Sequence, residues 1–209
     1  MTNFNDDFYK KCNEQRIELL RDIYGEKFFE NKTVLDLGGG VGYISNQLMK
    51  WGADCTVYEG RDINIELGRK LHPNVKFIKV DLQNFIPIKK FDIVLNFGVF
   101  YHLINPEVYL SQTAYLFNDF MLLDGNISTS GERFIEDNTI GIDQSLHGRV
   151  KLIDDEIINK TLENYNLESL NKKMNKIADK TGSPYDYENG EDFLKTNEMK
   201  RTFWMIKNN

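Results

Sequence analysis

A short apolar strand that runs directly into a glycine-rich turn and a helix constrains this chain more than any other feature. The segment is VLDLGGGVGYIS, residues 34–45. Glycine permits φ > 0 and lacks the Cβ that would hold a ligand away from the backbone. The helix N-terminus that follows offers free N–H groups and a positive dipole end to a carboxylate or phosphate. The segment therefore predicts a ligand-binding turn formed by Gly38, Gly40 and Gly42.

Strands and helices alternate along the first part of the chain. Apolar runs predict strands at residues 33–37, 55–58, 75–80, 91–97 and 120–123, and helical spacing predicts helices at 8–30, 43–51, 63–71 and 106–117. The strands are almost continuously apolar, as expected for strands that are buried on both faces. This alternation indicates an α/β fold, in which a mostly parallel sheet lies between two layers of helices.

The C-terminal part is less regular. Asp154 is a typical N-cap and predicts a helix over 154–165. The apolar positions at 167–177 fit either a helix or a strand that starts at Leu167, and residues 181–197 are typical of a loop. The segment RTFWMI, residues 201–206, predicts a final strand.

Polar residues stand at the ends of four predicted strands. Asp36 ends the first strand, Glu59 the second, Asp81 the third and Asn96 the fourth. Ligands of open α/β sheets bind at the carboxyl edge of the strands, where these side chains would gather. Glu59 follows the first glycine by about 20 residues, the spacing at which an acid accepts both hydroxyls of a ribose.

The residue pattern of the turn favours some classes of nucleotide-like ligand over others. A dinucleotide site of the form G-x-G-x-x-G needs its third glycine at position 43, where this chain has Tyr43. The P-loop pattern with its lysine is absent from the sequence. The carboxylate of Asp36 would repel a phosphate and fits a cationic or amine-bearing ligand.

At these positions the sequence resembles the class I S-adenosylmethionine-dependent methyltransferases. The resemblance covers about residues 30–125 and includes FDIVLNFGVFYHL, residues 91–103. It implies S-adenosylmethionine as cofactor and a Rossmann-like seven-stranded sheet in the order 3-2-1-4-5-7-6, with RTFWMI as its antiparallel seventh strand. The implied cofactor contacts are Asp36, Gly38, Gly40 and Gly42 for the methionine part, Glu59 for the ribose, Asp81 and Leu82 for the adenine, and Asn96, Phe97 and Gly98 beside the methyl donor.

A second resemblance lies in the C-terminal region. GIDQSLHGR at 141–149, a following helix, a tyrosine-rich loop and RTFWMIK are similar to small methyltransferases of bacterial polysaccharide and capsule gene clusters. It implies a small-molecule acceptor, a hydroxyl of a sugar or of a nucleotide-linked sugar. We expect residues 126–200 to select this acceptor, with an aromatic lid or a plain packing cluster formed by Tyr185, Tyr187 and Phe193.

Methyl transfer to a hydroxyl benefits from a general base. The candidates are Tyr101 and His102, just after the fourth strand, and His147 in the loop that follows the fifth. Each has a plain alternative: Tyr101 as a pocket wall, His102 as a core or capping residue and His147 as a surface residue.

Asp124, at the expected end of the fifth strand, and Asn126 resemble the ligands of metal-dependent catechol-type methyltransferases. However, the fourth strand has Asn96 where such a site needs an acid, and Gly125 separates Asp124 from Asn126. We therefore predict no bound metal.

The charge balance bears on the partners. Lys and Arg number 26 against 32 Asp and Glu, a net charge of -6, whereas a protein that binds phosphate backbones is normally basic. We therefore expect no nucleic-acid partner. RNA or protein methylation, a non-catalytic S-adenosylmethionine-binding role and a nicotinamide-dependent oxidoreductase are the alternatives.

Length and processing signals complete the expectations. The polar N-terminus has no signal pattern, and the longest uncharged run, residues 93–106, is shorter than the ~20 residues that span a bilayer. Two cysteines are too few for a disulfide framework. We expect a cytoplasmic protein with no membrane partner and one domain over 1–209 that begins with a helical segment, 1–30. A homodimer is left open.

Overall fold

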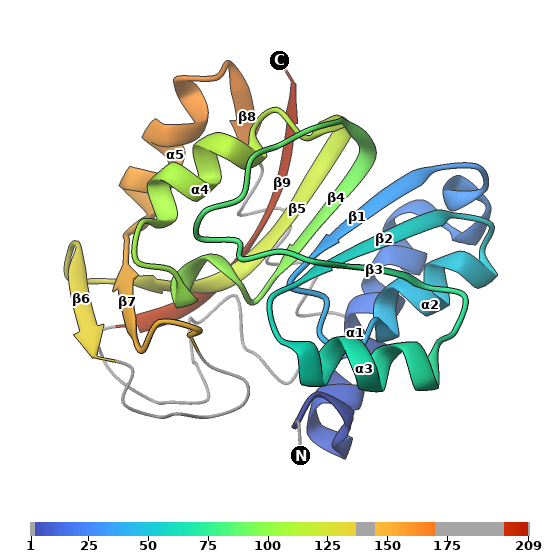
Figure 1. Cartoon of the computed structure of the whole chain (residues 1–209). Coiled ribbons are helices and arrows are strands. Elements are labelled where there is room, and N and C mark those ends of the chain that lie inside the picture. The colour runs from blue at the N-terminus through green and yellow to red at the C-terminus, as the bar shows by residue number, and fades with distance from the viewer. Residues whose placement is uncertain (1–2, 137–144, 170–198, 209) are drawn as a thin grey trace.

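The computed structural model describes residues 3–136, 145–169 and 199–208 (Figure 1). Its elements are η1 (Asn3–Asn5), α1 (Asp7–Tyr24), η2 (Glu26–Phe29), β1 (Thr33–Leu37), α2 (Tyr43–Lys50), β2 (Asp54–Glu59), α3 (Asp62–Leu71), β3 (Lys76–Lys79), β4 (Phe91–Phe97), η3 (Phe100–His102), α4 (Pro106–Thr113), β5 (Phe117–Ser128), β6 (Arg133–Glu136), β7 (Arg149–Leu152), α5 (Asp155–Glu163), β8 (Leu167–Ser169) and β9 (Met199–Asn208).

Seven strands form one sheet in the order β3-β2-β1-β4-β5-β9-β8. Strands β1 to β5 pair in parallel, and β9 runs antiparallel between β5 and β8. Because β8 and β9 are the sixth and seventh strands of this sheet along the chain, the order confirms the predicted 3-2-1-4-5-7-6. The segment RTFWMI lies within β9, as expected.

The structure differs from the prediction in two places and decides between two alternatives in a third. The fifth strand runs from Phe117 to Ser128 because β9 pairs with it as far as Ser128, so Asp124 lies inside the strand and not at its end. Of the two alternatives at Leu167, the structure has the strand, β8, over Leu167–Ser169, and the rest of that segment lies outside the described residues. A separate antiparallel pair, β6 and β7, was not expected from the sequence. The loop expected at 181–197 lies outside the described residues.

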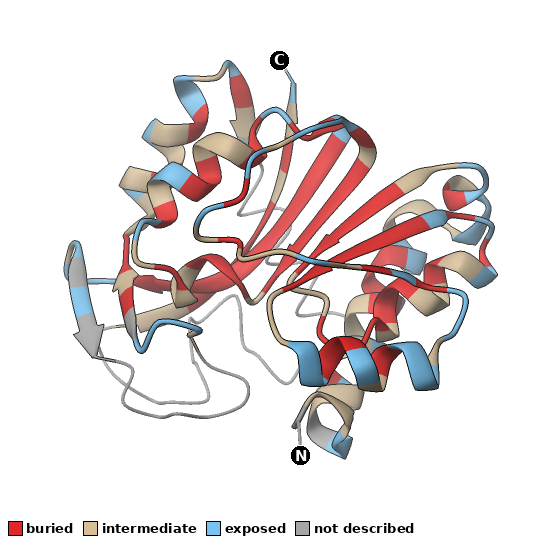
Figure 2. Ribbon diagram, in the orientation of Figure 1, coloured by how far each residue is buried: buried red, intermediate tan, exposed pale blue. Residues whose placement is uncertain are grey.

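Each face of the sheet carries its own apolar core, and the strands between them are buried (Figure 2). Successive side chains of a strand point to opposite faces. On one face, Leu20 of α1 and Leu48 of α2 pack with Val34 of β1. On the other face the core includes Leu110 of α4 and Trp204 of β9.

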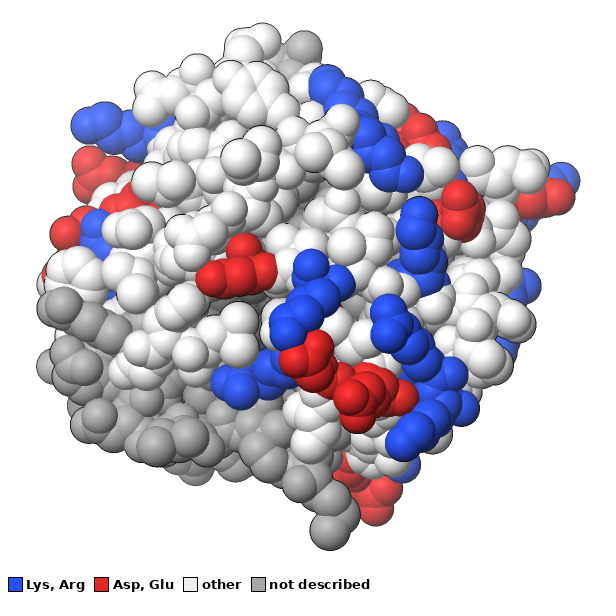
Figure 3. All heavy atoms as spheres, in the orientation of Figure 1, with Lys and Arg blue, Asp and Glu red and all other residues white. Residues whose placement is uncertain are grey.

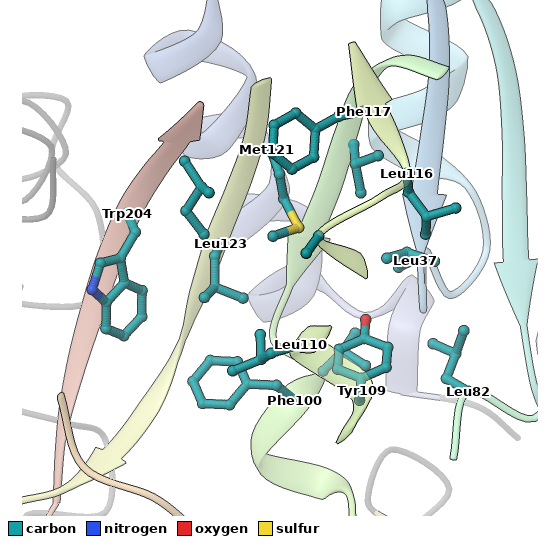
Figure 4. Packing of buried hydrophobic residues seen from close by; sticks show 14 of the residues in the cluster. Leu37, Leu82, Phe100, Tyr109, Leu110, Leu116, Phe117, Met121, Leu123 and Trp204 are labelled. Atoms are coloured by element: carbon teal, nitrogen blue, oxygen red, sulfur yellow. The ribbon is translucent and has the colours of Figure 1, made fainter. Parts of the chain in front are cut away.

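The second core draws together residues that are distant in the sequence (Figure 4). Trp204 of β9, Leu123 of β5 and Phe100 of η3 belong to it, and the rings of Phe100 and Trp204 meet edge to face with centroids 6.1 Å apart. Since η3 carries Tyr101 and His102, this packing holds the two candidate site residues beside Gly125 in the C-terminal half of β5.

The same alternation sorts the polar residues of the strands. Asp36, Asp124 and Arg201 share the parity of the residues that face α1, namely Val34 in β1, Leu122 in β5 and Phe203 in β9. Asn96 has the parity of Val94, which faces the core of the opposite side. The sheet therefore directs Asp36, Asp124 and Arg201 toward α1, and Asn96 away from it.

Asp154 caps α5 as the sequence predicts, because its Oδ1 accepts a 2.9 Å hydrogen bond from the N–H of Ile157. We expect Asp154→Ala to lower the free energy of unfolding by about 1 kcal/mol, since that N–H loses its partner. Urea denaturation measures the change. Glu156→Ala, an exposed change in the same first turn, is the control and should cost less than about 0.5 kcal/mol. Equal losses would contradict the cap.

Candidate active site

Two pockets adjoin each other at the carboxyl ends of the parallel strands. Both are lined by Phe4, Gly38, Gly98 and His102, so they form one continuous site. The first pocket lies over the ends of β2 and β3, with Glu59, Asp81 and Leu82 in its wall. The remaining residues that line the second pocket are Tyr9, Cys12, Asn13, Arg16, Asp36, Gly39, Ile44, Phe97, Tyr101 and Arg201.

The glycine turn follows the predicted geometry. Gly38, Gly40 and Gly42 have φ of 65°, 58° and 78°, in the left-handed region that favours glycine. Space is also short, because a Cβ on Gly38 would lie 2.5 Å from Cγ2 of Val99, and one on Gly40 would lie 2.8 Å from the ring of Phe4. Gly42 is the N-cap of α2. The turn thus brings bare backbone to the rim of the site.

Asp36 lies buried in the second pocket, with 3% of its surface exposed. Its Oδ2 accepts a 2.8 Å hydrogen bond from the hydroxyl of Ser45 in α2. Burial raises the pKa of Asp36 from 3.8 to about 6, and the Ser45 hydroxyl and the charge of Arg16 counteract only part of this rise. A buried carboxylate of this kind is stabilised by a cationic group in the pocket.

Glu59 is buried at the end of β2 and holds the glycine turn in place. Its Oε2 accepts a 3.0 Å hydrogen bond from the N–H of Gly40, and its Oε1 accepts one of 2.9 Å from the N–H of Arg61. Burial raises the pKa of Glu59 although these N–H groups act to lower it. The acid predicted to bind a ribose is therefore oriented in advance.

Asp81 lies in a loop just after β3, and its carboxylate is partly exposed in the first pocket. Burial acts to raise its pKa, but hydrogen bonds from the N–H of Gln83, from Asn84 and from His147 hold the pKa below its usual value. Nε2 of His147 is 3.2 Å from Oδ2 of Asp81. The structure thus places His147 beside Asp81, in the first pocket, and not beside Tyr101.

A short segment covers the outer side of the first pocket. Nη2 of Arg61 donates a 3.3 Å hydrogen bond to the carbonyl of Ser145, and Leu146 packs on Gly60, where a Cβ would lie 2.5 Å from Leu146 Cδ1. His147 completes this cover through Asp81. Residues 141–144 of the GIDQSLHGR motif lie outside the described residues, as do Tyr185, Tyr187 and Phe193.

Strand parity decides which of the other predicted residues line a pocket and which face the core. Phe97 and Gly98 line the second pocket, and Tyr101 and His102 follow them in η3 with ring centroids 4.2 Å apart. Asn96 is fully buried and lines neither pocket, because its side chain faces the core on the side of α4. The side chain of Asn96 therefore does not lie at the predicted position beside a methyl donor.

Two arginines in the second pocket were not predicted as site residues. Nε and Nη2 of Arg16 lie 3.1 and 2.5 Å from Oδ2 of Asp124, and Nε and Nη2 of Arg201 lie 2.6 and 3.1 Å from Oδ1 and Oδ2. Asp124 is fully buried; burial acts to raise its pKa, but the two guanidinium groups outweigh this and lower it. Its carboxylate is thus bound by two cations of the protein.

The N-terminal residues also contribute to the site without having been predicted to do so. Phe4 of η1 lines both pockets, and its ring lies 4.8 Å from that of Tyr9 in α1. The sequence does contain a signal that Arg16 is buried. It lies four residues after Cys12 and four before Leu20, which are buried residues on the apolar face of α1. A charged residue on that face needs a buried partner.

The chain belongs to the methyltransferase domain family, whose model matches residues 9–171. Among curated relatives, a ubiquinone biosynthesis O-methyltransferase of Maricaulis maris is 28% identical over 120 residues, 51% of this chain and 47% of that protein. Its counterpart in Bartonella quintana is 30% identical over 92 residues, 41% of this chain and 37% of that protein. The chain spans less than half the length of these relatives.

Solved structures share the fold. The N-terminal domain of EvdMO1, crystallised in the presence of SAH (S-adenosylhomocysteine) and D-fucose, matches with a TM-score of 0.70 at 17% identity over 95% of this chain and 83% of that chain. An O-methyltransferase of a trans-AT PKS multienzyme of Brevibacillus brevis, in complex with S-adenosylhomocysteine, gives 0.65 at 15% identity over 96% and 73%. Family and fold confirm the predicted class I S-adenosylmethionine-dependent methyltransferase.

The raised pKa of Asp36 predicts a gain in stability when the charge is removed. Because the folded-state pKa, about 6, lies above 3.8, the ionised group costs stability as pH rises through this interval, by up to about 3 kcal/mol. We expect Asp36→Asn to stabilise the ligand-free protein, and by about 1 to 2 kcal/mol more at pH 8 than at pH 5.

Urea denaturation of both proteins at the two pH values measures this difference. Asp119→Asn is the matched control, because the Asp119 carboxylate is partly exposed and pairs with Lys32 at the opposite end of β5. A stabilisation by Asp36→Asn that is the same at pH 5 and pH 8 would contradict the assignment of a buried, ionised Asp36.

Proposed function

We propose that this protein transfers the methyl group of S-adenosylmethionine to a hydroxyl of a small molecule, with a sugar or a nucleotide-linked sugar as the favoured acceptor. One observation carries the proposal. The glycine turn of β1 and three acids from successive strand ends, Asp36, Glu59 and Asp81, border one continuous cavity.

The described residues fit this cofactor. Asp36 offers a buried carboxylate to the ammonium group of the methionine part, next to the open backbone of the glycine turn. Glu59 can accept the ribose hydroxyls, and Asp81 an adenine amino group. The apolar wall of the first pocket suits a flat aromatic base and consists of Val80, Leu82, Val99, Leu103 and Leu146.

The chemistry needs little beyond alignment and removal of a proton. S-adenosylmethionine supplies an activated methyl group on a sulfonium. The protein has to hold the acceptor oxygen in line with it and exclude water. His102 lines both pockets at the junction, so we assign it the role of general base toward the acceptor hydroxyl. Tyr101 forms the adjoining wall.

The proteins similar to this chain support oxygen as the methylated atom and a sugar as the acceptor. The two curated relatives described above are named O-methyltransferases, and the EvdMO1 domain was crystallised in the presence of D-fucose. The favoured acceptor is therefore a hydroxyl of a sugar, consistent with the C-terminal sequence resemblance.

RNA methylation is less favoured by the distribution of charge. On the face shown in Figure 3, basic and acidic side chains are interspersed over the half of the molecule that carries β2, β3 and α3. Nucleic-acid backbones are bound by continuous basic surfaces. Separately, no helix among the described residues is long and apolar enough to cross a membrane.

We expect wild-type protein to bind S-adenosylhomocysteine in a calorimetric titration. Glu59→Gln should weaken this binding about 10- to 100-fold, because glutamine retains one acceptor oxygen where the N–H groups of Gly40 and Arg61 already need two. Asp62→Asn, which removes an exposed carboxylate paired with Lys79, is the control and should bind normally. No binding by wild type would overturn the proposal, and unchanged binding by Glu59→Gln would overturn the ribose assignment.

Variants of the three histidines of the chain distinguish a role in catalysis from a role in cofactor binding. A mass-spectrometric screen of sugars and nucleotide sugars for the gain of one methylene identifies a working acceptor. With it, His102→Gln should lower kcat about 100-fold or more and leave the affinity for S-adenosylhomocysteine unchanged. His147→Gln should weaken cofactor binding through Asp81, and His72→Gln, at the far end of α3, should change neither. A normal kcat in His102→Gln would contradict its role as base.

A further inference from the structure

The guanidinium of Arg201 presents two edges to different surroundings. Nε and Nη2 bind the carboxylate of Asp124 at 2.6 and 3.1 Å. Nη1 lies 3.4 Å from the hydroxyl oxygen of Tyr101 and 3.5 Å from Oδ1 of Asn126. Both Arg201 and Tyr101 line the second pocket, although only 3% of Arg201 is exposed. Asp124 therefore fixes the orientation of a buried cation at the pocket wall.

These groups converge on the junction of the two pockets. A Cβ on Gly98 would lie 3.5 Å from Nη2 of Arg201 and 3.6 Å from the hydroxyl oxygen of Tyr101. Gly98 lines both pockets and has φ of 75°, so its bare backbone leaves room beside the two side chains. Any ligand that passes Gly98 in the second pocket meets Arg201 and Tyr101.

Arg201 lies on the side of the junction opposite to the cofactor residues. In the sheet, β4 separates β1 and β2, which carry Asp36 and Glu59, from β5 and β9, which carry Asp124 and Arg201. Arg16 is different, because its charge acts on both Asp36 and Asp124 and so it lies between the two regions. The region around Arg201 is therefore the part of the pocket left to an acceptor.

We infer that Arg201, oriented by Asp124 and flanked by Tyr101, binds a negatively charged oxygen group on the methyl acceptor, a carboxylate or a phosphate. The inference rests on the proposed methyltransferase function and makes Arg201 a residue that determines acceptor specificity. A guanidinium keeps its charge at every working pH and binds two oxygens of a carboxylate or phosphate through paired N–H donors. Burial strengthens such a contact relative to one in water.

Three sugars that differ in charge test the inference. Protein saturated with S-adenosylhomocysteine is titrated with D-glucuronate, D-glucose 1-phosphate and D-glucose at constant ionic strength, and binding is followed by NMR. We expect at least one anionic sugar to bind 10-fold or more tightly than D-glucose. The two anionic sugars distinguish a carboxylate from a phosphate as the preferred group.

Arg201→Lys keeps the positive charge and the ion pair with Asp124. However, a guanidinium can bind Asp124 with one edge and a pocket ligand with another, and a single ammonium group cannot. We expect this variant to lose most of the preference for the anionic sugar, at least 5-fold, with unchanged affinity for S-adenosylhomocysteine. Tyr101→Phe, which removes only a hydroxyl, should lose about 3-fold. Arg21→Lys, an exposed arginine of α1 paired with Glu26, is the control and should retain the preference.

Equal binding of the three sugars, or no binding of either anion, would overturn the inference. So would a preference that survives in Arg201→Lys, or a loss of S-adenosylhomocysteine binding in that variant with no change toward the sugars. Failure of the proposed function gives a different result, because wild-type protein would then bind no S-adenosylhomocysteine in the calorimetric titration that precedes the sugars.

Discussion

The parallel pairing of β1 with β2 on one side and with β4 on the other is the constraint on which the site depends. Leu37, the last residue of β1, is in register with Tyr58 of β2 and with Asn96 of β4. The N–H of Gly38 then donates a 2.7 Å hydrogen bond to the carbonyl of Tyr58, so the glycine turn starts where the ladder ends. The first residues after β1, β2, β3 and β4 therefore line the same site; they are Gly38, Gly60, Val80 and Gly98.

The parallel strands can be predicted from the sequence because they depend on local apolar patterns, and the strand order follows from the family resemblance. Apolar runs marked the strands, and Glu59 and Asp81 follow directly from where strands end. The side chain of Asn96 lines neither pocket because the position of a residue at a strand end does not give its parity, and a shift of one residue changes the face that a side chain meets. Arg16 and Arg201 were missed because their common partner, Asp124, is 108 and 77 residues away in the sequence.

Two buried carboxylates near the second pocket differ in the charges that surround them. Asp36 is buried with a hydroxyl and a more distant arginine, and its pKa is raised. Asp124 is buried more completely, yet two guanidinium groups bind it directly and its pKa is lowered. Burial alone therefore does not decide the state of a carboxylate here. The proposed function pairs Asp36 with the ammonium group of the cofactor, whereas Asp124 is already bound by two cations of the protein.

The two pockets depend on different parts of the sequence, because only the second includes a residue of β9. The groups that line the first pocket come from residues 4–147, whereas Arg201 reaches the second pocket only after the last strand has inserted between β5 and β8. A truncation before β9 would therefore remove Arg201 from the second pocket and keep in the sequence every residue that lines the first.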